Sequence, residues 1–122
     1  MSQRQADVFG SVVVYVRESY RLMGIEDPPA MPLLIHALGA KADHPTVTAL
    51  AEMTGLSVNT VSRTVKTLRD KHLVECETDP KDERLKRVVL TTKGHRLVAA
   101  LYNSLAITSR TIFAILNRDS LP

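Results

Sequence analysis

The sequence has no tryptophan, one cysteine, three tyrosines and two phenylalanines, and these scarcities exclude several classes of protein. The single cysteine, Cys76, rules out an internal disulfide framework and fits a reducing cytoplasm. No Gly-rich phosphate loop or nucleophile elbow is present, and no histidine has a Cys, Asp or Glu partner at metal-ligand spacing. We therefore expect no enzymatic activity, no catalytic residue, no cofactor and no metal site.

Long apolar runs and a secretion signal are also missing. No apolar run approaches the roughly 20 residues needed to span a bilayer. The first ten residues, MSQRQADVFG, lack the basic segment followed by an apolar one that a secretory signal has. These absences predict a cytoplasmic protein with no membrane partner.

The charge of the chain is unevenly distributed. The 122 residues carry a formal net charge of +3, which alone does not establish a nucleic-acid partner. Residues 1–45 carry four Lys/Arg against five Asp/Glu, whereas residues 58–72 carry four basic residues against Asp70 alone. The length suits one domain with a single core, and the basic charge is concentrated in its middle.

Two helices are predicted before the basic segment. Apolar residues recur at helical spacing from Ala6 to Met23, and Gly24 suits a C-terminal stop. The stretch VVVYV is also compatible with a strand, but the longer period of 3.6 residues favours a helix. A second helix is predicted from Pro32 to about Ala42. Its buried face is expected to hold Leu33, Leu34, Ala37 and Leu38.

The stretch TVTALAEMTGLSVNTVSRTVKTLRDKHLV has the pattern of a helix-turn-helix. Thr48 suits the N-cap of a short helix that ends just before Gly55. Gly55 permits a left-handed turn, and Leu56 is expected to fill the core. Ser57 caps a longer second helix that runs to His72.

The second helix has one apolar and one polar face when its residues are placed 100° apart. The apolar stripe is Val58, Val61, Val65 and Leu68. The opposite side carries Asn59, Arg63, Lys66 and Asp70, flanked by Ser62 and Thr67. A solvated face is the ordinary explanation of such a pattern. In a helix-turn-helix, however, these amides, hydroxyls and cations suit base edges and phosphates, so we predict a recognition helix.

The stretch VECETDPKDERLKRVVLTTKG predicts a β-hairpin directly after that helix. Apolar and charged residues alternate on either side of the loop TDPKDER, and Pro80 suits the start of the turn. A hairpin in this place is a wing, whose cations Lys81 and Arg84 reach a phosphate backbone or minor groove. Asp82 is placed to orient the Arg84 guanidinium. Cys76 alternates inward, which favours a small buried residue over a redox sensor.

These segments resemble the multiple-antibiotic-resistance regulator (MarR) family of winged-helix transcription factors. The resemblance lies in LAEMTGLSVNTVSRTVKTLRDKHLVE, DPKDER and LTTKG, and covers about two-fifths of the chain. It implies an obligate dimer with recognition helices in successive major grooves and wings at adjacent minor grooves. By motif, Asp82 and Arg84 are the wing-tip pair, and Thr91 and Gly94 lie where the second strand passes into a long helix. His72 stands where the family usually has glycine.

Two helices outside the basic segment are predicted to form the dimer. They span residues 6–24 and 92–118, and the second is expected to be interrupted near Thr108 and Ser109. Members of the family usually end with two helices after the wing, whereas this sequence has room for one. A smaller or differently packed dimer interface is therefore expected. Tyr15, Tyr20 and Tyr102 either belong to this apolar surface or line an effector pocket.

Taken together, the patterns predict a mainly helical protein with a small β-hairpin. It is expected to be one winged-helix domain, residues 1–122, with the DNA-binding winged helix-turn-helix at 45–91. Expected partners are double-stranded DNA, a second copy of the chain and a small-molecule effector. The expected function is transcriptional repression, and the alternatives are a protein-interaction module or a DNA-binding protein of plasmid or phage replication or partition. The residues expected to contact DNA are Ser57, Asn59, Thr60, Ser62, Arg63, Lys66, Thr67, Lys81, Asp82, Arg84 and Lys86.

Overall fold

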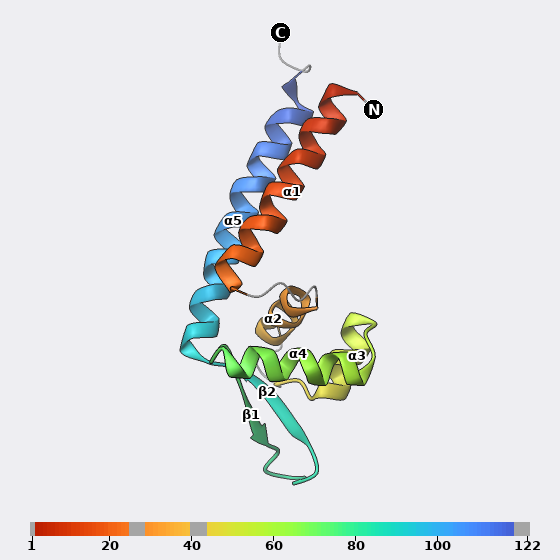
Figure 1. Ribbon diagram of the computed structural model, residues 1–122, viewed down its shortest axis with the longest axis vertical. Coiled ribbons are helices and arrows are strands. Elements are labelled where there is room, and N and C mark those ends of the chain that lie inside the picture. The colour runs from red at the N-terminus through yellow and green to blue at the C-terminus, as the bar shows by residue number, and fades with distance from the viewer. Residues whose placement is uncertain (1, 25–28, 40–43, 119–122) are drawn as a thin grey trace. The chain divides into compact units, whose positions relative to one another are not determined.

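The computed structural model describes residues 2–24, 29–39 and 44–118, which form five helices and one two-stranded antiparallel sheet (Figure 1). The chain divides into two compact units, residues 26–98 and residues 1–25 with 99–122. The larger unit holds α2 (Ala30–Gly39), α3 (Val47–Thr54), α4 (Val58–Asp70), β1 (Val74–Thr78), β2 (Lys86–Leu90) and the start of α5 (Thr92–Leu116). The smaller unit holds α1 (Gln3–Met23) and the rest of α5. The predicted combination of mainly helical structure with one hairpin is confirmed.

Hydroxyl side chains fix the starts of α3 and α4. The Ser57 Oγ accepts a hydrogen bond from the Thr60 amide at 3.1 Å, which confirms the predicted cap of α4. The cap of α3 is Thr46, whose Oγ1 accepts from the Ala49 amide at 3.1 Å, so the prediction of Thr48 is wrong. The bridge between Thr46 and Arg87 holds Thr46 extended, and this places its hydroxyl below the first turn of the helix.

The core of the larger unit lies between α2, α3, α4 and the sheet. The residues with the largest fully buried side chains include Leu33 and Leu34 of α2, Leu50 of α3, Val61, Thr64 and Leu68 of α4, and Val88 of β2. Val58 was predicted to join this core, but it is 48% exposed. The buried face of α4 repeats at Val61, Thr64, Val65 and Leu68, and Val58 lies in the first turn, outside that stripe.

The hairpin follows α4 closely. Val74 pairs with Leu90, Cys76 with Val88 and Thr78 with Lys86. On the other edge of β2, the Val88 amide donates to the Pro45 carbonyl at 2.8 Å, so β1 is the free edge strand. α4 ends at Asp70, two residues before the predicted end, because His72 has a positive φ of 60° and turns the chain into β1.

The smaller unit contains two long helices. α1 begins at Gln3 with a capping box between Ser2 and Gln5, three residues before its predicted start, and Gly24 ends it in the left-handed conformation as predicted. α5 runs without interruption from Thr92 to Leu116, so the expected break near Thr108 is absent.

Large apolar side chains of these two helices are mostly exposed. Among them are Phe9 (58%), Val13 (62%), Tyr102 (70%), Ile107 (61%) and Phe113 (69%). In the described part of the chain, α5 alone is long and apolar enough to cross a membrane, with a mean hydropathy of 1.3 and 11% burial of that stretch. The sequence has no unbroken apolar run of about 20 residues, because uncharged polar residues interrupt the apolar stretch of α5, but they lower its mean hydropathy little.

Candidate nucleic-acid interface

The outer face of α4 separates the predicted contact residues into two groups. Ser57, Thr60 and Thr67 already have partners inside the helix: the Ser57 Oγ donates to Thr60 Oγ1 at 2.8 Å, and Thr67 Oγ1 donates to the Arg63 carbonyl at 3.2 Å. The second group is exposed and has no side-chain hydrogen bond or ion pair to any described residue. It consists of Asn59, Ser62, Arg63 and Lys66. These four side chains are the ones available to a ligand.

Asp79 organises the turn of the wing, although it was not among the residues that the sequence predicted to contact DNA. One of its carboxylate oxygens accepts from the amides of Lys81 (2.7 Å) and Asp82 (3.2 Å), and the other accepts from Arg87 Nε (2.7 Å). Arg87 Nη1 also donates to the His44 carbonyl at 2.7 Å. The hydrogen bond from Arg87, together with the amides, holds the pKa of Asp79 below its usual value. The dipeptide Asp79–Pro80 is a turn-initiating pattern that could have identified this residue.

Asp82 and Arg84 make the contact predicted for the wing tip. Arg84 Nε and Nη2 donate to the Asp82 carboxylate at 3.1 and 3.3 Å, and the Arg84 amide donates to the same group at 3.0 Å. These hydrogen bonds lower the pKa of Asp82 from its ordinary value. The Arg84 side chain nevertheless stays 89% exposed. The tip therefore presents a charged, oriented guanidinium to solvent.

The two wing lysines differ in their surroundings. Lys81 is exposed in the turn, next to the Asp79 network. Lys86 begins β2, and its Nζ donates to Thr78 Oγ1 across the hairpin at 2.6 Å. The wing thus carries cations along the hairpin as well as at its tip.

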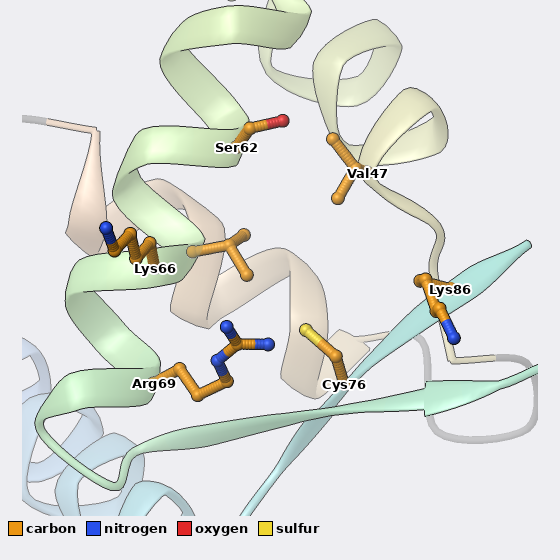
Figure 2. Close-up of a pocket in the computed structure, with 7 residues that line it drawn as sticks. Val47, Ser62, Lys66, Arg69, Cys76 and Lys86 are labelled. Atoms are coloured by element: carbon orange, nitrogen blue, oxygen red, sulfur yellow. The ribbon is translucent and has the colours of Figure 1, made fainter.

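Between α4 and the wing lies a groove of about 310 Å³, here called the α4–wing groove (Figure 2). Its lining residues are Val47, Ser62, Val65, Lys66, Arg69, Cys76 and Lys86. Cys76 was predicted to be buried, but it is only half-buried and lines this groove. Cys76 lies on β1, the free edge strand, and faces this groove rather than the closed core.

Comparison with known proteins finds one family model and several solved structures that are similar to this chain. The family model described as the MarR family matches residues 28–85. The S. aureus MepR–DNA complex is 21% identical, with a TM-score of 0.78 over 93% of this chain and 83% of that one. A MarR transcriptional regulator from Methanosarcina mazei Go1 is 22% identical, with a TM-score of 0.71 over 88% and 75% of the two chains.

A third solved structure contains a ligand. PcaV from Streptomyces coelicolor, in complex with its natural ligand, is 22% identical, with a TM-score of 0.63 over 79% of this chain and 68% of that one. No curated protein sequence matches this chain. The structural likenesses confirm the predicted winged-helix fold.

Proposed function

We propose that the protein is a MarR-family transcription regulator that is cytoplasmic and sequence-specific and acts as a repressor. The match of the MarR family model to residues 28–85 supports this proposal. The observation that carries the proposal is the pairing of two exposed basic surfaces in one unit. α4 presents Arg63 and Lys66 without ion pairs to described residues, and the wing presents an oriented Arg84. The solved MepR complex contains DNA, which supports this use of the fold.

In the proposed complex, α4 lies in the major groove. Asn59 and Arg63 project from its exposed N-terminal half, where an amide suits adenine and a guanidinium suits guanine. Lys66 lies further along the helix and pairs with phosphate. Ser57, Thr60 and Thr67 keep their hydrogen bonds within the helix, and the N-terminus of α4 favours a nearby phosphate.

The wing enters the adjacent minor groove. Arg84 is the inserted cation, since a narrow A·T-rich minor groove has enhanced negative potential. Asp82 holds the guanidinium in place through its hydrogen bonds of 3.1 and 3.3 Å. Lys81 and Lys86 lie beside it and contact the backbone.

A second copy of the chain is proposed to cover the exposed apolar side chains of α1 and α5. Two recognition helices related by a two-fold axis would then read half-sites about 10 bp apart. A small-molecule effector is proposed to bind beside these helices, where a groove of about 500 Å³ is lined by both and includes Tyr15. PcaV, solved with its natural ligand, supports an effector of this kind.

The proposal is tested by selecting bound sequences from a random duplex library with the full chain and measuring affinity across salt concentrations. We expect a two-fold symmetric site whose affinity falls steeply with salt through counterion release. Arg63→Ala should cost about 1–3 kcal/mol and relax preference at particular base pairs. Failure to enrich any duplex would overturn DNA binding and favour a protein-interaction module.

Repression is tested separately. A reporter gene carrying the selected site across its promoter should be expressed less when the wild-type chain is present, and Arg63→Ala should restore expression. Increased expression with the wild-type chain would show activation, and enrichment of plasmid replication origins alone would favour a role in replication.

A further inference from the structure

The α4–wing groove is a basic concave surface of the larger unit. Three of its seven lining residues are cations, Lys66, Arg69 and Lys86, and none of the seven is acidic. The cations come from two different elements, α4 and β2. A concave site that gathers cations in this way is suited to an anion.

Arg69 is the cation that is best directed into the groove. In Figure 2 its guanidinium points toward Cys76 on the facing strand, whereas the Lys66 amine extends along the outer side of α4. The guanidinium makes no hydrogen bond or ion pair with another described residue. Its planar fork of donors matches the oxygens of a phosphate, which two parallel hydrogen bonds can hold.

Position along α4 separates this group from the base-reading residues. Ser62 and Arg69 are seven residues apart, close to two full turns, so they share the edge of the helix that borders the groove. Asn59 and Arg63 are absent from the groove lining and lie toward the outer face. In the proposed complex, Asn59 and Arg63 of α4 therefore face the base edges, whereas Ser62 and Arg69 face the α4–wing groove.

A duplex bound as proposed must fill that gap. When α4 occupies the major groove and the wing occupies the adjacent minor groove, the sugar–phosphate strand between the two grooves crosses between helix and hairpin. The α4–wing groove lies at that crossing, because residues of α4 and of both strands line it. A phosphate group fits within its volume of about 310 Å³.

We propose that the α4–wing groove holds one backbone phosphate of the strand that separates the major from the minor groove, with Arg69 as its principal ligand and Ser62 and Lys86 as further donors. The proposal rests on the proposed function and adds a residue, Arg69, that no sequence pattern had assigned to DNA. Binding of this phosphate sets the depth to which α4 enters the major groove of the DNA and the wing enters the minor groove. Arg69 then contributes affinity at every sequence and no base preference of its own.

The first experiment scans the selected duplex with single neutral methylphosphonates and measures binding by wild type and Arg69→Gln. Wild type should lose about tenfold in affinity at one phosphate in each half-site, the loss expected for a charge-assisted hydrogen bond. Arg69→Gln should bind the unmodified duplex about tenfold more weakly. Its affinity should no longer fall when a methylphosphonate replaces that one phosphate. The slope of log affinity against log salt concentration should become shallower by about 0.9 per half-site. Arg96→Gln is the matched control, since it removes the same charge from an exposed position at the start of α5.

Cys76 supplies an independent reporter, because it is the chain's single cysteine and lines the groove. Its thiolate displaces sulfinate from methanethiosulfonate reagents to form a mixed disulfide that mass spectrometry counts. An anionic sulfonatoethyl reagent should react faster than a cationic trimethylammonium one, and Arg69→Gln should reduce that ratio. Bound duplex should slow both reactions.

The outcomes separate this inference from the proposed function. If the duplex binds tightly but Arg69→Gln matches Arg96→Gln in affinity and in its methylphosphonate pattern, the phosphate site is wrong and DNA binding stands. Unchanged labelling of Cys76 on a saturating duplex would also overturn the site. If no duplex is bound at all, the proposed function itself fails.

Discussion

The two units of the molecule differ in the burial of their apolar side chains. In the winged-helix unit, leucines and valines from three helices and the sheet are fully buried within one chain. In the pair of helices formed by α1 and α5, residues such as Val13, Ile107 and Phe113 are more than 60% exposed. Exposed apolar surface of that extent marks an association site. The first unit buries its core within one chain, whereas the second has an apolar surface that the proposed second copy of the chain would cover.

The largest effect should come from making the exposed helix pair polar. Phe113→Asp should convert a dimer into a monomer and lower affinity for a two-fold symmetric duplex about a hundredfold or more, because bivalent binding is lost. Sedimentation and duplex titration measure the two effects. Met53→Asp is the control, because Met53 is 47% exposed on α3 of the winged-helix unit, and it should leave the assembly unchanged.

Two results would contradict this view of the helix pair. One is a Phe113→Asp chain that sediments and binds as wild type does. The other is a wild-type chain that stays monomeric and floats with lipid vesicles, which would assign the apolar face of α5 to a bilayer.

The next largest effect is on stability, and it is tested by replacing a glycine with alanine in each of the two units. A Cβ at Gly94 would lie 2.1 Å from the Leu73 carbonyl oxygen, a backbone atom, so Gly94→Ala should destabilise the winged-helix unit by about 3 kcal/mol. A Cβ at Gly10 would meet nothing within 4 Å, so Gly10→Ala should stabilise α1 by about 0.5–1 kcal/mol. Denaturant unfolding measures both. Equal effects of the two alanines would show that the close approach at Gly94 is absent in solution.

A smaller effect tests the carboxylate that organises the wing. The pKa of Asp79 is lowered in the folded state, so its contribution to stability is present above its unfolded pKa and is lost as pH falls through the folded value. Asp79→Asn should lower the thermal midpoint by several degrees at neutral pH, and the difference from wild type should narrow as pH drops below about 4. Melting curves across pH check this, and a constant difference would exclude the carboxylate's charge as the cause.

Features predicted correctly from the sequence are those that neighbouring residues determine. The Ser57 cap, the Gly24 stop and the Asp82–Arg84 contact each join residues no more than four apart. The features that were missed depend on distant segments. Arg87 reaches the His44 carbonyl across 43 positions, and the exposure of Cys76 depends on how α4 covers an edge strand. Periodicity located α4, but it also placed Val58 in the buried stripe, and Val58 is 48% exposed.

The smallest effect concerns the link between α4 and the wing, where the sequence has histidine in the position that the family usually gives to glycine. His72 has a φ of 60°, and a left-handed conformation costs a residue with a Cβ about 1–2 kcal/mol. His72→Gly removes that cost but adds backbone entropy to the unfolded chain, worth about 0.5–1 kcal/mol, so a net gain of about 0.5 kcal/mol is expected. The neighbouring Lys71 has a φ of −87°, and Lys71→Gly should therefore only destabilise. Denaturant midpoints of the two variants decide the matter: a loss of stability in both would mean that His72 stabilises this turn through its side chain.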